Sequence, residues 1–327
     1  MDVVYFSSDQ FAPITGTSIV SLLENNRDAK SIMIYYIDDG VSDEKKNQTE
    51  AIVRSYNRDI VYIPAPTIDE LFEFKFNNPY QLGHSYMRMG LGMILPKHLD
   101  RVLCLDSDTI VLGSLKDLWN LDMGNNILAG VADCVNVKAF KKQFMLGIDD
   151  VYCNAGMFLI NLKEWRNSKV EETIRSIIKS KNGNIFFVEQ TLMNYVCKGR
   201  IIKLPPEYNS YTLFYALKFN NLIRWRRPTN FYTEEEVKRA SVNPIIVHFT
   251  RNFYMTSRPW VEGCDHPFTA HYIKYTKFTP WQKLEKDNRS FKTKVIYRLV
   301  HCIPQKFLAY IINVIYNDIR PLIVAEK

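Results

Sequence analysis

The sequence predicts an α/β protein with a mostly parallel central sheet flanked by helices. Short apolar runs at residues 3–6, 31–37 and 60–63 have the length and composition of buried strands, and helical stretches separate them. Such alternation is typical of parallel strands joined by crossover helices. With 327 residues, of which 46% are hydrophobic, the chain can bury a large core.

The predicted elements follow one another in a regular order. After the first strand, the polar loop SSDQ leads to a helix at 17–25, and the turn DDG at 38–40 leads to a polar helical stretch. Apolar residues at helical spacing predict a helix at 86–95, which a strand at 102–105 follows. Further along we expect strands at 128–132, 156–160 and 245–249, and helices at 164–178 and 189–196.

The pattern changes near residue 280, which divides the chain into a predicted domain at 1–279 and a basic tail at 280–327. From Pro280 onward nine Lys or Arg stand against four Asp or Glu, so most of the net charge of +7 lies in the tail. Basic and long aliphatic residues alternate there, and Pro304 divides the segment into two helices. This pattern favours attachment to an anionic membrane surface over docking onto the domain, and it argues against nucleic acid as the partner.

Composition also predicts where the protein is found. The six cysteines are scattered and include no C-x-x-C pair, which favours a reducing compartment. The N-terminal MDVVYFSSDQ lacks the basic and apolar regions of a signal peptide, and no apolar run approaches the roughly 20 residues needed to cross a bilayer. We therefore expect a cytoplasmic protein that attaches peripherally to the cytoplasmic face of the inner or plasma membrane.

Two carboxylates follow the predicted strand at 102–105, in the motif Asp106, Ser107 and Asp108. Ligands collect at the carboxyl ends of strands in open α/β sheets, and residues i and i+2 can share one hard cation that neutralises a diphosphate. His248, after the apolar run PIIV, would complete an O,O,N set suited to Mn²⁺ or Mg²⁺, the imidazole favouring Mn²⁺. Solvated acids in a turn and a structural histidine also explain these residues.

Several segments taken together resemble glycosyltransferase family 8, namely FSSDQ at 6–10, HSYMR at 84–88, LDSD at 105–108, NAGMFLINL at 154–162, EQTLMN at 189–194, and HF followed by RPW. The resemblance runs from about residue 1 to about residue 275. It is nearest to the bacterial branch that builds lipopolysaccharide and other surface glycans, with glycogenin more distant. It implies a GT-A fold and retaining transfer of a hexose from UDP-glucose or UDP-galactose to a glycan acceptor, in this branch a lipid-linked one.

The resemblance also implies which residues bind the donor. Asp106, Asp108 and His248 match the positions that hold Mn²⁺ on the UDP diphosphate. The other residues expected to bind the nucleotide sugar are Ser7, Ser8, Asp9 and Gln10 in the first loop, Ser107 in the D-x-D motif, and Asn154 and Ala155 beneath the sugar. The family often has an acidic residue where this chain has Ser8.

Three further residues match catalytic positions of the family. Arg88 matches the arginine on the sugar side, or alternatively forms a salt bridge that holds the D-x-D loop. Glu189 and Gln190 match the acidic-Gln pair beside the anomeric carbon. In a front-face route both stabilise oxocarbenium-like charge, whereas in a double displacement Glu189 is the better nucleophile. Without the resemblance the pair would be interpreted as a cap on an amphipathic helix.

The chain departs from the family pattern after its histidine, where HFTRNFYMTSRPW replaces the usual Gly and Lys-Pro-Trp. Arg251 lies at the Gly position and Arg258 precedes Pro259, so two arginines are candidates for binding the diphosphate.

Two other functions remain alternatives. Nucleotidyltransferases also pair carboxylates with Mg²⁺, although the segments EQ and NAGMFLINL argue against that function. A nucleotide-sugar-binding protein that has lost catalysis would explain the departures from the pattern. The basic and aromatic RWRR at 224–227 is typical either of a site for an anionic acceptor or of a solvated loop.

Overall fold

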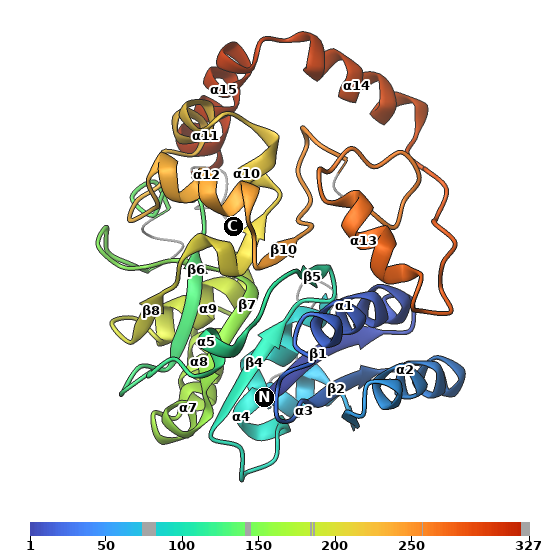
Figure 1. The fold of residues 1–327 in the computed structure, drawn as a ribbon. Helices are drawn as coiled ribbons and strands as arrows, with labels where there is room; N and C mark the ends of the chain where they lie inside the picture. Colours follow the sequence, from blue (N-terminus) through green and yellow to red (C-terminus); the bar gives the residue numbers. More distant parts are fainter. Residues whose placement is uncertain (74–82, 141–144, 184, 186, 257, 322–327) are drawn as a thin grey trace.

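The computed structural model describes residues 1–73, 83–140, 145–183, 185, 187–256 and 258–321. Its centre is a seven-stranded sheet with the strand order β3-β2-β1-β4-β7-β6-β8 (Figure 1). Neighbouring strands are parallel except that β7 runs antiparallel to β4 and β6, which confirms the predicted mostly parallel sheet. The strands are Asp2–Ser8 (β1), Met33–Asp39 (β2), Asp59–Pro64 (β3), Arg101–Leu105 (β4), Leu128–Ala132 (β6), Cys153–Asn161 (β7) and Ile201–Lys203 (β8).

Helices cover both faces of this sheet, because successive strand residues point to opposite sides and both sides are apolar. Tyr5 lies in the core that β1 shares with α1 (Ala12–Glu24) and α2 (Asp43–Ser55). Its neighbour Val4 lies in the second core, on the opposite face. The helical segments of that core are α3 (Ile68–Phe72), η2 (Gly83–Gly90), α4 (Leu91–Ile94), α7 (Leu162–Asn167), α8 (Val170–Ser180) and α9 (Val188–Val196).

A second, three-stranded sheet has the order β5-β10-β9. Its strands are Thr109–Val111 (β5), Ile246–His248 (β10) and Ser210–Tyr211 (β9). The strand predicted at 245–249 is β10, which therefore pairs outside the central sheet. Since β5 starts directly after the D-x-D motif, pairing of β5 with β10 brings a distant part of the chain to the end of β4.

Two helices differ from their predicted bounds at the N-terminal side. α1 begins at Ala12, five residues before the predicted start, because Pro13 in its first turn fits the start of a helix. The helix predicted at 86–95 is instead the 3₁₀-helix η2 followed by the short α4. Gly90 is the last residue of η2 and leaves space for Leu71, whose Cδ1 would lie 2.2 Å from an added Cβ.

The helix predicted at 164–178 is also divided. Lys169 adopts a left-handed φ of 52° between α7 and α8, which ends the first helix and turns the chain before the second. The remaining segments before the tail are α5 (Lys116–Trp119), η3 (Pro206–Asn209), α10 (Leu213–Ala216), α11 (Phe219–Arg226), α12 (Glu234–Val242) and α13 (Thr269–Thr276).

The tail forms two helical stretches on either side of Pro304, as the sequence predicts. α15 (Gln305–Asn313) and the π-helical η4 (Val314–Ile319) pack against α11, and Leu308 and Tyr316 are buried there (Figure 1). α14 (Phe291–Cys302), which the structure describes in full, buries none of its residues. Burial of side chains against the domain therefore holds α15 and η4, whereas α14 has no buried residue.

No single helix among the described residues has the length and apolar character to span a membrane; only α14 combined with residues 305–319 does so, as a pair bent by 114°.

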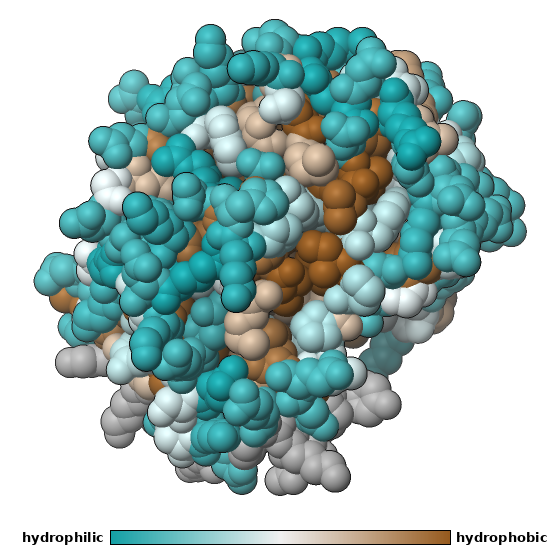
Figure 2. All heavy atoms as spheres, turned by 90° about the horizontal axis from the view of Figure 1, so that it is seen from below, coloured by the Kyte–Doolittle hydropathy of each residue, from teal (hydrophilic) through white to brown (hydrophobic). Residues whose placement is uncertain are grey.

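Figure 2 views the molecule from the lower side of Figure 1 and shows hydrophilic residues around a band of hydrophobic ones. The N-terminal ends of β1, β2 and β4 border a hollow, which Met33 and Trp119 help to line. That hollow lies at the end of the sheet opposite the D-x-D motif.

Candidate active site

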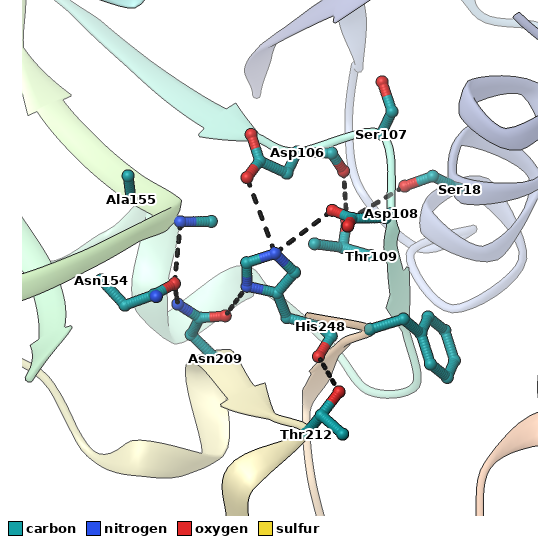
Figure 3. A network of polar contacts seen from close by, with 12 residues as sticks. Ser18, Asp106, Ser107, Asp108, Thr109, Asn154, Ala155, Asn209, Thr212 and His248 are labelled. Carbon is teal, nitrogen blue, oxygen red and sulfur yellow. Dashed lines mark hydrogen bonds and ion pairs between the residues drawn. The ribbon is translucent and has the colours of Figure 1, made fainter. Parts of the chain in front are cut away.

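The D-x-D motif lies at the junction of the two sheets. Asp106 follows β4 directly, and Asp108 precedes β5, whose Thr109 is paired with His248 of β10. The backbone N–H of Phe249 donates to the carbonyl of Asp108 at 2.9 Å, which ties the motif to the end of β10. Strand pairing therefore brings both aspartates to His248, as Figure 3 shows.

These three side chains converge on one point. His248 Nε2 lies 3.6 Å from Asp106 Oδ2 and 3.2 Å from Asp108 Oδ1. One ligand atom from each residue falls within 4.8 Å of the other two. Two carboxylate oxygens and an imidazole nitrogen at this spacing fit a divalent cation. The structure thus brings together the three residues that the sequence singled out as metal ligands.

An arginine holds the other oxygen of each carboxylate. Arg88, whose side chain is 4% exposed, donates from Nη2 to Asp106 Oδ1. Arg258 donates from Nη1 to Asp108 Oδ2 at 2.6 Å. Of the two arginines considered for the diphosphate, Arg258 therefore reaches the motif, whereas Arg251 is exposed. Each aspartate is left with one oxygen for a cation.

The charges of these groups depend on one another. Burial opposes charge on Asp108, yet His248 and Arg258 hold the pKa of this carboxyl well below its ordinary range. Burial likewise opposes charge on His248, but the Asp108 carboxylate raises its pKa above the ordinary value. Asp108 is therefore ionised and ready to bind a cation at neutral pH, and a cation that binds Nε2 must displace any proton held there.

A chain of hydrogen bonds with a single direction fixes the histidine. The backbone N–H of Gly156 donates to Asn154 Oδ1 at 3.0 Å, and Asn209 Nδ2 donates to the same oxygen at 2.9 Å. Asn209 must then use its Oδ1 as the acceptor opposite His248 Nδ1, 3.1 Å away (Figure 3). In the neutral imidazole the proton is thus held on Nδ1, and the lone pair of Nε2 points to the aspartates.

Gly156 also leaves the space that the imidazole occupies. A Cβ added at this position would lie 2.1 Å from both Cε1 and Nδ1 of His248. The backbone oxygen of Gly156 accepts from the N–H of Asp106 at 2.9 Å, so the glycine contacts the motif as well as the histidine. The third residue of N-A-G is therefore small because the ring packs against its backbone.

The two residues of the Glu-Gln pair face different surroundings. Gln190 Oε1 accepts from the backbone N–H of Ala155 at 3.1 Å, and its Nε2 donates to Asp133 Oδ2 at 2.9 Å. The same oxygen of Asp133 lies 3.4 Å from Asn154 Nδ2. Gln190 therefore supports the N-A-G turn, whereas Glu189 lines the cavity described next.

A cavity of about 210 Å³ opens beside the D-x-D motif. Its lining contains seven of the predicted site residues, namely Ser7, Ser8, Arg88, Asp106, Ser107, Asp108 and Glu189, and adds Phe6 and Phe11. Ser107 points away from His248, and its Oγ donates to the carbonyl of Phe6 at 2.8 Å (Figure 3). A lining that combines aromatic rings, hydroxyls and charged groups fits a ligand with an aromatic base and a diphosphate.

Two predicted first-loop residues are oriented elsewhere. The Asp9 carboxylate accepts from the backbone N–H of Ser42 at 3.0 Å and from Lys45 Nζ at 2.7 Å. Its hydrogen bond with Lys45 lowers the pKa of Asp9 to about 2. Gln10 is exposed, and neither residue belongs to the cavity lining among the described residues. In this conformation Asp9 joins the first loop to α2.

Sequence reasoning missed two residues of the polar network. Asp133 follows β6, which runs parallel to β4, so its carboxylate lies at the same edge of the sheet as the D-x-D motif. The rule that singled out Asp106, a carboxylate directly after a buried strand, would also have found Asp133. Asn209 ends the short 3₁₀-helix η3, and no pattern in the sequence indicates that it faces His248.

Comparison with known proteins assigns the family. The model of glycosyl transferase family 8 matches residues 2–264, and the chain belongs to this family. It is 23% identical over 289 residues to general stress protein A of Bacillus subtilis, covering 87% of this chain and 96% of that protein. It is 24% identical over 288 residues to the lipopolysaccharide 1,2-glucosyltransferase of Escherichia coli, covering 86% and 79% respectively.

The fold is shared with a solved transferase. The structure of the galactosyltransferase LgtC in complex with donor and acceptor sugar analogues matches with a TM-score of 0.69 and 21% sequence identity. The match covers 90% of this chain and 100% of that one, which confirms the predicted GT-A fold.

The position of Gly156 predicts the effect of a single methyl group. Gly156→Ala should displace the imidazole of His248 and weaken Mn²⁺ binding by about 10- to 100-fold, as loss of a supporting contact does at other metal sites. Mn²⁺ affinity is measured by electron paramagnetic resonance titration. Gly113→Ala is the matched control, because its Cβ would meet only ordinary contacts, 3.6 Å from Ile245. Equal affinities in both variants would contradict the assignment.

The hydrogen-bond chain predicts a difference between two substitutions of Asn209. Asn209→Leu removes the acceptor opposite Nδ1 and should weaken Mn²⁺ binding about 10- to 100-fold, whereas Asn209→Asp keeps an acceptor and should retain most of it. The same titration compares the two variants. In NMR spectra of the Co²⁺-loaded protein, the proton on His248 Nδ1 should exchange with D₂O faster in Asn209→Leu than in wild type. Equal metal affinities in Leu and Asp variants would show that the acceptor is unimportant.

Proposed function

We propose that this protein is a retaining hexosyltransferase that moves glucose or galactose from a UDP-sugar to the glycan acceptor of a lipopolysaccharide or another cell-surface polysaccharide. The observation that carries the proposal is the convergence of Asp106, Asp108 and His248 beside a cavity that Arg88 and Glu189 also line. The donor and acceptor classes are supported by the similar proteins, a lipopolysaccharide glucosyltransferase and the galactosyltransferase LgtC.

The residues of the site have separate tasks in this reaction. Asp106, Asp108 and His248 would hold Mn²⁺, or Mg²⁺ in its place, which supplies Lewis-acid stabilisation to the departing UDP. Arg258 already lies at the motif and can bind the diphosphate through two parallel N–H groups. Arg88 holds Asp106 from a buried position, so it keeps the ligand oxygen oriented on the sugar side of the cavity.

The remaining residues act on the sugar. The bond from the anomeric carbon to the UDP oxygen breaks, the acceptor hydroxyl gives up its proton, and its oxygen forms the new bond to the anomeric carbon with retention of configuration. In a front-face route the departing phosphate oxygen accepts that proton. Glu189 lines the cavity and would stabilise the positive charge that develops at the anomeric carbon. Gln190 is tied to Ala155 and Asp133, so in this proposal it orients the N-A-G turn under the sugar.

Release of UDP from a panel of UDP-sugars tests the proposal. With Mn²⁺ present, UDP-glucose or UDP-galactose should be hydrolysed slowly and transferred faster once a suitable acceptor is added. Asp108→Ala should lower UDP release at least about 100-fold because it removes a ligand outright. Asp59→Asn, an exposed carboxylate of β3, should leave the rate unchanged.

Other outcomes of this assay would support the alternatives. Tight binding of UDP without turnover, even with glycan acceptors, would indicate a binding protein that has lost catalysis. Release of sugar 1-phosphate instead of UDP would indicate a nucleotidyltransferase, because transfer of the uridylyl group breaks the bond between the two phosphates.

We also propose that the tail attaches the protein to the cytoplasmic face of the inner or plasma membrane, where a lipid-linked acceptor is found. Exposed large hydrophobic side chains are concentrated between residues 291 and 319, at Phe291, Ile296, Leu299, Phe307, Tyr310, Ile311, Val314, Ile315 and Ile319. Lys292, Lys294, Arg298 and Lys306 lie between them in the sequence. Basic residues interleaved with exposed apolar ones suit an interface with anionic lipid.

Sedimentation with lipid vesicles tests this attachment. The protein should bind vesicles that contain phosphatidylglycerol more tightly than neutral ones, and added salt should weaken the binding. The double variant Ile296→Ser with Leu299→Ser should bind at least about tenfold more weakly, because each side chain loses the gain from leaving water. Val242→Ser, an equally exposed apolar residue of α12, is the control and should bind normally.

A further inference from the structure

We propose that α14 holds the loop that delivers Arg258 to the D-x-D motif, and that binding of α14 to an anionic lipid surface therefore strengthens donor binding. The proposal rests on the function proposed above and adds a link between the membrane surface and the donor site. The tail contacts the segment that connects β10 to α13 at several places.

The position of the Arg258 side chain at the D-x-D motif depends on the conformation of the segment between β10 and α13. Arg258 Nη1 reaches Asp108 Oδ2 at 2.6 Å and the carbonyl of Phe249 at 3.2 Å, and its guanidinium lies 4.9 Å from the Trp260 ring. An arginine side chain has several rotatable bonds, and these contacts hold the side chain of Arg258 in one position. That position is kept only while the backbone around Arg258 is kept.

Polar contacts close the segment into a loop. The Asp265 carboxylate accepts from the backbone N–H of Thr256 at 2.8 Å and also from its hydroxyl. On the N-terminal side, Asn252 Oδ1 accepts from the backbone N–H groups of Tyr254 and Met255 at 2.7 and 2.8 Å. The loop is therefore held at Asp265 and in the turn around Tyr254.

α14 contacts the loop at both of these places. The hydroxyl of Tyr297 donates to Asp265 Oδ2, and the ring of His301 stacks on Tyr254 with 4.5 Å between centroids and 21° between planes. Gln305, which follows α14, donates to the hydroxyl of Tyr254 at 3.1 Å. Tyr297 and His301 lie one helical turn apart, so one side of α14 faces the loop.

The chain before α14 holds the other side of the loop. The backbone N–H of Glu285 donates to the carbonyl of Trp260 at 2.7 Å, and the N–H of Glu262 donates to the carbonyl of Glu285 at 2.8 Å. Tail residues therefore contact the chain on both sides of Arg258, and α14 provides two of these contacts.

α14 is itself weakly held, which makes it sensitive to a partner. It has 12 residues, and none of them is buried among the described residues. A helix of this length is only marginally stable alone in water. Its solvent side carries Phe291, 84% exposed, and Leu299, 60% exposed, while Lys292 and Arg298 add positive charge. An anionic lipid surface would cover the apolar side chains and pair with the charges, and so stabilise the helix.

Stabilising α14 would also stabilise the loop and the position of Arg258, because Tyr297 and His301 join the two. The coupling is reciprocal: if lipid strengthens donor binding by a given factor, the donor strengthens lipid binding by the same factor. A purely structural role of α14 would give no such reciprocity.

The experiment measures UDP binding in the presence of Mn²⁺ by calorimetry, with and without phosphatidylglycerol vesicles. Wild type should bind UDP at least about fivefold more tightly on vesicles, the lower end of typical coupling. The variant Tyr297→Phe with His301→Ala should still bind vesicles and UDP but lose this increase. Tyr310→Phe removes a hydroxyl from an exposed residue of α15 and should keep this increase. Vesicle sedimentation with and without UDP checks the reciprocal factor.

The possible failures are distinguishable. Vesicle binding that leaves the UDP affinity of wild type unchanged would overturn the coupling, and so would an increase that persists in the double variant. Failure of wild type to bind vesicles would overturn it too, for example if α14 were covered by a second copy of the chain. Absence of UDP binding under every condition would instead contradict the proposed transferase. Thermal unfolding of each variant checks that lost coupling is not lost folding.

Discussion

The pairing of β5 with β10 is the constraint on which the site depends. The D-x-D motif ends a strand of the central sheet, but Asp108 can meet His248 only because the next three residues pair with a strand more than 130 positions further along the chain. The resulting small sheet also places Asn209 behind the imidazole and Arg258 beside Asp108. A change that separates the two strands would therefore separate the three candidate metal ligands while leaving most of the central sheet in place.

The charges around this junction explain why the site suits a diphosphate. Asp106 and Asp108 are each paired with one guanidinium, from Arg88 and Arg258, so the four charged groups balance before any ligand binds. A divalent cation then adds two positive charges in a partly buried place. An anionic ligand that binds together with the cation restores the charge balance. Water screens the attraction between charges less in a partly buried place than in bulk solvent. The cation and the nucleotide sugar are thus expected to bind cooperatively.

The sequence predicts those parts of the fold that depend on local pattern. Buried strands such as β4 and β6 are continuous apolar runs, and the acids that follow β4 are visible without any structure. The sequence does not predict the 3₁₀-helix η2, because apolar residues at helical spacing do not distinguish it from an α-helix, and the contact of Gly90 with Leu71 joins residues distant in the chain. The sequence does not predict the role of Asn209 either, because that role depends on the residue opposite its side chain. Contacts between residues far apart in the chain leave no periodic signal.

The tail shows how an amphipathic pattern can be interpreted too simply. Its alternation of basic and apolar residues predicts an outward-facing helix, and α14 does expose Phe291 and Leu299. Yet its inner side carries Tyr297 and His301, polar aromatic residues that contact a loop instead of an apolar core. α14 is held by polar contacts on its inner side and carries apolar side chains on its outer side. Such a helix gains stability mainly from whatever covers the outer side. The tail and the donor site are then parts of one equilibrium, even though the composition of the chain changes between them near residue 280.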